Sequence, residues 1–154
     1  MNQFMKLAIE EARRGFNRDD GGPFGAVILK DGVPIASAHN EVLKTNDPTA
    51  HAEITAIRAA THKLQRFKLT DCDMYSTCEP CPMCLGAIYW SGISIVYYGN
   101  TRDDAEKYGF DDSHIYQQIS MPVEKRLIRF LRVLGKDALE AFKFWDQKTN
   151  KIQY

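Results

Sequence analysis

The sequence Thr77-Cys78-Glu79-Pro80-Cys81-Pro82-Met83-Cys84 is the most informative stretch of the chain, because it holds three of the four cysteines. The spacing of Cys81 and Cys84 lets two thiolates bind one tetrahedral zinc ion at about 2.3 Å each. The two prolines prevent the preceding strand from continuing and favour a helix start. The stretch therefore predicts a metal site where a strand passes into a helix.

A second motif, His51-Ala52-Glu53, stands before this stretch in the sequence. One histidine and two cysteines leave the fourth zinc position open to water, as in catalytic sites and unlike structural ones. Zinc lowers the pKa of a bound water molecule from about 15.7 toward 7 and so provides a nucleophile at neutral pH. We therefore expect His51, Cys81 and Cys84 to form a catalytic zinc site.

Glu53 is expected to lie beside the metal without binding it. Two residues apart on a regular helix, His51 and Glu53 point about 200° away from each other. They converge only if they lie in the first turn of the helix, with Glu53 behind the ligands. A carboxylate in that position can take a proton from water and return it to a leaving amine.

Two other interpretations of the cysteines stay open. A four-thiolate structural zinc or an iron–sulfur cluster would need a fourth cysteine, and the ferredoxin spacing would place it at Ile88. Cys72 and Cys78 are better interpreted as small buried residues. A zinc-stabilised binding module without turnover is the other interpretation; it requires Glu53 to be idle and the fourth zinc position to be filled.

Composition indicates one globular domain of 154 residues with zero net charge. Proteins that bind nucleic acid usually carry an excess of basic residues, so we expect a small neutral substrate. The chain starts without a basic region followed by an apolar run, and no stretch approaches the ~20 apolar residues of a membrane span. We therefore expect a cytoplasmic protein.

Apolar periodicity and turn residues predict an α/β layered sheet. Asp31-Gly32 between two apolar runs predicts a β-hairpin. The predicted helices cover residues 2–16, 51–64, 83–90 and 136–150. The predicted strands cover residues 24–29, 34–38, 73–77, 93–98 and 127–133. The remaining residues are expected in loops and in a mixed polar segment from 101 to 122.

The two motifs together resemble the cytidine deaminase superfamily, whose nucleobase deaminases carry H-x-E followed by P-C-x-x-C. Bacterial tRNA adenosine deaminases share these motifs. Three further segments resemble the small bacterial guanine deaminases of the superfamily, as does the tail from Phe142 onward. These segments are Gly21-Gly22-Pro23-Phe24-Gly25-Ala26-Val27, Ala87-Ile88-Tyr89-Trp90 and Gly109-Phe110-Asp111-Asp112-Ser113-His114-Ile115-Tyr116.

The resemblance implies a three-layer α/β/α fold with a five-stranded mixed sheet and one Zn²⁺ per subunit. It implies deamination of guanine to xanthine, with Glu53 as proton shuttle and Asp112 as a second acid that contacts the amino group. It also implies a homodimer that exchanges the C-terminal segment from about residue 136 to 154. The substrate-binding residues implied are Asn40, Phe24, Trp90, Ala52 and Tyr154.

Several of these roles have plain structural alternatives. Phe24 and Trp90 are also typical core residues, Asn40 is also a typical strand end, and Asp111-Asp112 also suits a helix cap. Deamination of tRNA adenosine, guanosine or cytosine also stays open, because the sequence does not reveal the size of the pocket.

Overall fold

The computed structural model describes residues 2–153, which divide into two compact units, one through Ser113 and one from His114 onward. The first unit contains α1 (Gln3–Phe16), β1 (Gly25–Lys30), β2 (Val33–His39), α2 (Val42–Thr45), α3 (Ala52–Leu64), β3 (Cys72–Cys78), α4 (Pro82–Ser91), β4 (Ile95–Asn100) and α5 (Arg102–Lys107). The second contains α6 (Ser113–Ser120), the 3₁₀ turn η1 (Val123–Lys125) and α7 (Gly135–Gln147).

The first unit is built on a mixed sheet with the strand order β2-β1-β3-β4. β1 runs antiparallel to β2 and β3, whereas β3 runs parallel to β4. The predicted hairpin is confirmed: Asp31 and Gly32 both have positive φ, 51° and 74°, which a two-residue turn with the natural twist of the strands requires. Asp-Gly is among the few dipeptides that adopt this turn easily.

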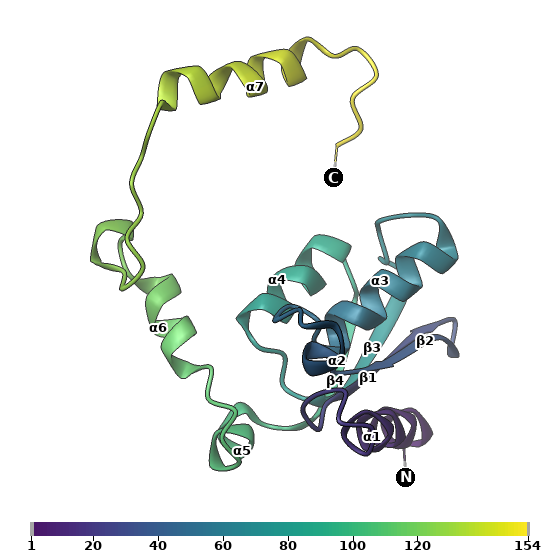
Figure 1. Cartoon of the computed structure of the whole chain (residues 1–154). Helices are drawn as coiled ribbons and strands as arrows, with labels where there is room; N and C mark the ends of the chain where they lie inside the picture. Colours follow the sequence, from purple (N-terminus) through teal and green to yellow (C-terminus); the bar gives the residue numbers. More distant parts are fainter. Residues whose placement is uncertain (1, 154) are drawn as a thin grey trace. The chain divides into compact units, whose positions relative to one another are not determined.

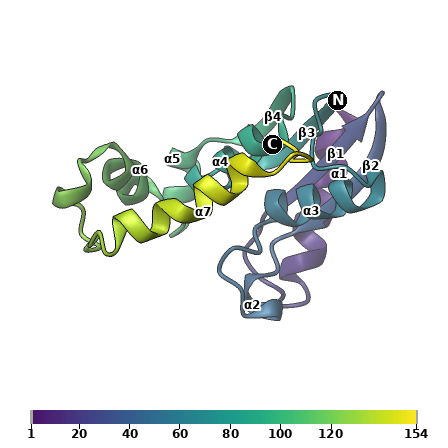
Figure 2. The same ribbon diagram turned by 90° about the horizontal axis from the view of Figure 1, so that it is seen from above.

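Alternation along β1 creates a separate core on each face of the sheet. Ala26 and Ile28 pack with the buried alanines of α3, whereas Val27 and Leu29 pack with Ala8 of α1. Figures 1 and 2 show α1 on one side of the sheet and α3 on the other, with α4 beside α3. The predicted three-layer α/β/α arrangement is therefore present in this unit.

The predicted fifth strand is wrong. In the described residues the sheet has four strands, and residues 127–133 form neither strand nor helix. Their side chains are exposed, with Leu127, Ile128 and Val133 each at least three-quarters accessible. Alternating apolar residues form a strand when a neighbouring strand satisfies their backbone groups, and the described residues of their own unit form helices and loops.

The second unit has little interior of its own. None of its described residues is fully buried, although α7 carries Leu139, Phe142 and Phe144. An amphipathic helix gains most of its stability by packing its apolar face. None of the described helices has the length and apolar composition that crossing a membrane requires.

Candidate metal centre

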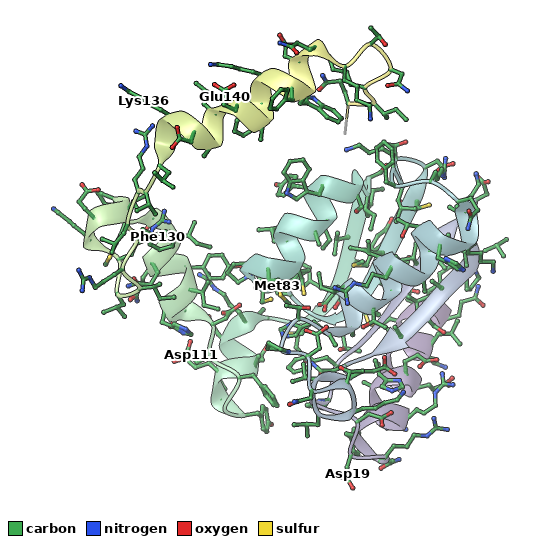
Figure 3. All side chains as sticks on the ribbon, turned by 45° about the horizontal axis from the view of Figure 1, so that its top comes forward. Asp19, Met83, Asp111, Phe130, Lys136 and Glu140 are labelled. Atoms are coloured by element: carbon green, nitrogen blue, oxygen red, sulfur yellow. The ribbon has the colours of Figure 1, made fainter. Side chains whose placement is uncertain are left out.

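Two helix starts position the predicted metal ligands. His51 is the N-cap residue of α3 and Cys81 is the N-cap residue of α4, both with extended backbone and neither with a side-chain capping bond. Pro82 in the first turn of α4 lacks an N–H, which costs nothing there. Both ligand side chains therefore remain free to point toward each other. Figure 3 shows the start of α4, where Met83 is labelled.

The three predicted ligands converge with spacings that suit zinc. Nδ1 of His51 lies 3.6 Å from Sγ of Cys81 and 3.6 Å from Sγ of Cys84, and all three atoms lie within 4.8 Å of one another. Tetrahedral zinc with Zn–S of about 2.3 Å and Zn–N of about 2.0–2.1 Å requires an N···S separation of about 3.6 Å. The side chains therefore fit zinc bound through Nδ1 of His51.

The electrostatics of the two thiols also suit a cation. Hydrogen bonds from Cys84 and then from His51 lower the pKa of Cys81 to about 4. The same contact with Cys81, together with burial, raises the pKa of Cys84, and the bond to Cys81 raises the pKa of His51. In the protein alone, one thiol thus carries the charge and the other the proton, and a cation that displaces this proton stabilises both thiolates.

Glu53 lies behind the three candidate ligands. Its Oε1 accepts a hydrogen bond from Oγ of Ser76 on β3 at 2.8 Å, and its Oε2 accepts from Sγ of Cys84 at 3.4 Å. The side chain is buried, and burial is the main cause that raises its pKa. A carboxyl group whose pKa is raised in this way is suited to accept and return a proton near neutral pH.

The two neighbouring aspartates have different surroundings. Oδ1 of Asp111 accepts a hydrogen bond from the backbone N–H of Ser113 at 2.7 Å, and so meets the first residue of α6. Asp112 is partly buried, and its pKa is raised first by burial and then by the negative charge of Cys81. The negative charge of Cys81 thus acts on Asp112, whereas the Asp111 carboxylate bonds to the start of α6.

Asn40 and Phe24 lie side by side in the first unit. The backbone N–H of Asn40 donates to the carbonyl of Phe24 at 3.0 Å, and the next residue, Glu41, donates to the carbonyl of Ala50 at 2.9 Å, directly before His51. The Phe24 ring packs edge-on against Phe110, with ring centres 4.8 Å apart. Main-chain hydrogen bonds thus hold Phe24 beside Asn40, and hold the residue after Asn40 beside the residue before His51.

The other predicted residues lie at different positions relative to the metal ligands. Ala52 is fully buried in the first turn of α3, directly after His51. Trp90 is exposed and lies nine residues beyond Cys81, about 14 Å along the axis of α4. Tyr154 lies outside the described residues. Cys72 and Cys78 are free and buried, as predicted.

Sequence reasoning missed two contributors. Ser76 donates a hydrogen bond to Glu53. It lies two residues after Met74 in β3, so both side chains face the same side of the sheet, where Met74 packs in the core with α3. Alternation along β3 could therefore have predicted that Ser76 faces Glu53. His39 is buried between two carboxylates, Glu11 and Asp20. No local pattern connects these three residues, because they come from separate segments of the chain.

Residues 1–100 match the family model of the cytidine and deoxycytidylate deaminase zinc-binding region. The chain is 50% identical to guanine deaminase of Bacillus subtilis over 151 residues, which covers 98% of this chain and 97% of that protein. The X-ray structure of that guanine deaminase superimposes with a TM-score of 0.96 and covers 100% of this chain and 99% of its own.

Two further similarities cover less of the chain. A guanine deaminase structure from Nitrosomonas europaea matches with a TM-score of 0.68 and 34% identity, over 71% of this chain and 63% of that one. The tRNA-specific adenosine deaminase of Aquifex aeolicus is 44% identical over 95 residues, which is 62% of each protein. The similarity to the Bacillus enzyme thus extends through the second unit, whereas the similarity to the Aquifex enzyme does not span the chain.

Proposed function

Because the chain belongs to the cytidine and deoxycytidylate deaminase family, we propose that it catalyses the zinc-dependent hydrolysis of guanine to xanthine and ammonia. The observation that carries the proposal is the buried Glu53 directly behind Cys84, in a chain whose similarity to guanine deaminase continues to its end. His51, Cys81 and Cys84 hold the zinc ion. When bound, zinc lowers the pKa of a water molecule and so provides the nucleophile.

The other steps are assigned to side chains. Water adds its oxygen to C2 of guanine while Glu53 takes a proton from it and delivers that proton to N3. Glu53 then takes the second proton of that water, now on the hydroxyl at C2, and returns it to the amino nitrogen with the help of Asp112. The bond between C2 and that nitrogen breaks, ammonia leaves, and the oxygen at C2 becomes the carbonyl oxygen of xanthine. Burial supports both roles, because it raises the pKa of each carboxyl group toward the range in which it exchanges protons.

The base is held by groups of two kinds. Phe24 and Trp90 cover its flat faces, and Asn40 binds a polar atom at its edge, next to the backbone at Ala52. The contact between Phe24 and Phe110 supports this role, because a fixed aromatic edge forms a firm wall for a planar ring. Trp90 is the least supported of these residues, given its position along α4.

We further propose that the whole chain acts as one deaminase domain in a cytoplasmic homodimer, without a nucleic-acid partner. Its C-terminal segment, from about residue 136 to 154, exchanges between subunits and brings Tyr154 to the neighbouring site. The exposed apolar side chains of α7 support the exchange, because they need a surface to cover them. A truncated chain lacking residues 150–154 should lose most guanine turnover; full activity of that truncation would count against the exchange.

The function is tested by measuring ammonia release and ultraviolet change with guanine, guanosine, adenine, cytosine and cytidine in parallel. Turnover of guanine with little turnover of guanosine is expected, because the tail is proposed to close the pocket. Preference for guanosine would keep the chemistry and contradict the closed pocket. If zinc-loaded protein turns over none of these five compounds but deaminates a tRNA anticodon stem-loop, the proposal is overturned in favour of tRNA adenosine deamination.

A further inference from the structure

A buried cluster of three ionisable side chains has no part in the proposed chemistry. It consists of Glu11 on α1, Asp20 in the loop after α1, and His39 at the end of β2, each less than one-tenth exposed. Nε2 of His39 lies 2.8 Å from Oδ2 of Asp20, and Nδ1 lies 3.4 Å from Oε2 of Glu11. Both ring nitrogens therefore face carboxylate oxygens, and we name the three residues the His39 cluster.

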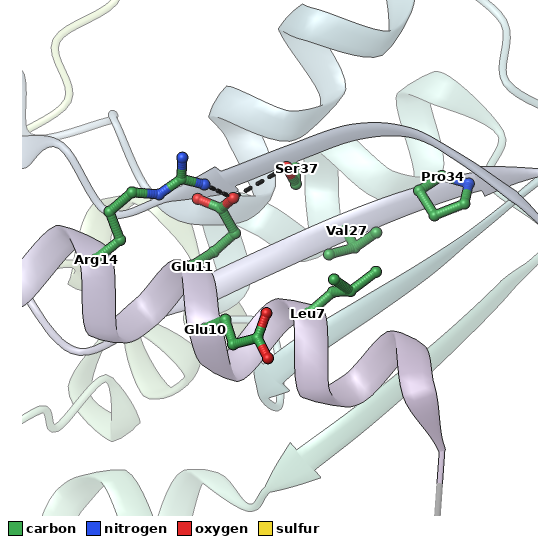
Figure 4. A pocket seen from close by; sticks show the side chains of 7 residues that line it. All are labelled: Leu7, Glu10, Glu11, Arg14, Val27, Pro34 and Ser37. Atoms are coloured by element: carbon green, nitrogen blue, oxygen red, sulfur yellow. Dashed lines mark hydrogen bonds and ion pairs between the residues drawn. The ribbon is translucent and has the colours of Figure 1, made fainter.

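The surroundings of the His39 cluster hold it in place. Glu11 also forms an ion pair with Arg14 and accepts a hydrogen bond from Oγ of Ser37; Figure 4 shows these three residues in the lining of a pocket. On the other side, Nζ of Lys44 lies 3.9 Å from Asp20 and closer to Glu41. Asp20, His39 and Glu41 are possible ligands for a metal ion, but the Lys44 ammonium already supplies the cation there.

The His39 cluster joins the two segments that hold Asn40. His39 directly precedes Asn40, and Asp20 directly precedes Gly21. A methyl group at Gly21 would lie 2.1 Å from Oδ1 of Asn40, so the loop contacts the carboxamide itself. The carbonyl of Asp20 also accepts the backbone N–H groups of Leu43 and Lys44, both at 3.0 Å, on the far side of Asn40.

These contacts determine which end of the Asn40 carboxamide is available. Its Oδ1 accepts the N–H groups of Gly22 at 3.3 Å and Val42 at 3.2 Å. Because backbone N–H groups are donors only, the carboxamide is oriented with oxygen toward the loop. The Nδ2 amino group remains to meet a substrate, and it donates hydrogen bonds to an acceptor such as a ring nitrogen or carbonyl oxygen.

We propose that the His39 cluster positions Asn40, so that the carboxamide presents its amino group to an acceptor atom of the purine. His39 is thus a positioning residue for substrate selection and not a catalytic residue. The inference rests on the proposed function, in which Asn40 binds the base. It assigns a purpose to three buried ionisable side chains, a kind of group that well-packed apolar residues often replace without loss of stability.

The test is a double-mutant cycle on guanine turnover by zinc-loaded protein. His39→Ala should lower kcat/KM about tenfold, mainly through a higher KM, because a displaced binding group weakens substrate binding. In the Asn40→Ala background the same change should lower kcat/KM by less than about twofold, because the group being positioned is gone. His39→Gln, which keeps an N–H donor, should recover most of the loss.

The controls separate positioning from general damage to the fold. His62→Ala removes an exposed histidine of α3 and should leave both constants unchanged. If His39→Ala does not fold, His39→Phe keeps the ring volume and enters the same cycle. Equal losses in both backgrounds, or wild-type kcat/KM in a folded His39 variant, would overturn the positioning role. Wild-type protein that fails to turn over guanine would instead overturn the proposed function, and this inference with it.

Discussion

Replacing Glu53 by Gln tests the proton shuttle without emptying its site. Gln has the same shape, so its oxygen can still accept the hydrogen bond from Ser76. The amide cannot take a proton from water or return it. General acid–base catalysis contributes about 10²–10⁴-fold, so kcat for guanine should fall by that factor, which corresponds to about 3–5 kcal/mol in the barrier.

The same substitution has an opposite effect on folding. Burial raises the pKa of Glu53, so the folded state binds a proton more tightly than the unfolded state. For the metal-free wild type, this group's contribution to the free energy of unfolding is greatest at low pH. It is lost as pH rises from the usual carboxyl range through the raised folded pKa. Glu53→Gln has no such ionisation, so its free energy of unfolding should exceed that of the wild type by the largest amount at neutral pH.

Both effects need a matched control and a metal measurement. Glu10→Gln makes the same chemical change at an exposed position of α1, and should leave kcat unchanged. Zinc content, measured by atomic absorption, should stay at one ion per chain in Glu53→Gln. Loss of zinc from that variant, or retention of wild-type kcat, would refute the assignment of Glu53 as the proton shuttle.

Three further predictions concern the thiols, the glycines and Asp112. At pH 7 zinc binding should release about one proton per ion, because Cys84 keeps its proton until the metal displaces it, while Cys81 has a pKa of about 4. Calorimetry in buffers of different ionisation enthalpy measures the number of protons released. Zinc binding without proton release would contradict the prediction. Gly86→Ala should raise the free energy of unfolding by about 0.5–1 kcal/mol, because its methyl group meets open space in a helix. Gly25→Ala should lower the free energy of unfolding by about 1–3 kcal/mol, because its methyl group would lie 2.1 Å from the Ala8 carbonyl oxygen. Urea denaturation of both glycine variants measures the two changes. Equal changes in the two variants would contradict this prediction. Asp112→Asn should reduce kcat about 10–100-fold with zinc retained, and stopped assays showing a change in KM alone would assign Asp112 to binding instead.

Short-range rules explain why the sequence is enough to group the three candidate metal ligands. Pro82 requires a helix start after Cys81, the Cys-x-x-Cys spacing brings both thiols onto one turn, and Glu53 has to share the first turn of α3 with His51. The Asp31-Gly32 hairpin is predicted for the same reason, since two adjacent residues with positive φ define it.

Features that depend on distant segments are not visible in the sequence. The alternation of residues 127–133 favours a strand, but a strand needs a neighbouring strand, and the residues described in the second unit include none. Glu11, Asp20 and His39 meet only because α1, its following loop and the end of β2 pack together. Each would be interpreted alone as a surface residue, since charged side chains are seldom buried unless paired.

The most direct test of the account is a zinc titration of metal-free protein, with xanthine formation from guanine followed at each addition. If His51, Cys81 and Cys84 hold the catalytic ion, turnover should rise in proportion to zinc and level off at one equivalent per chain. Cys81→Ser should need far more zinc to reach any activity. Full guanine turnover without zinc, or one equivalent of zinc bound without turnover, would contradict the account.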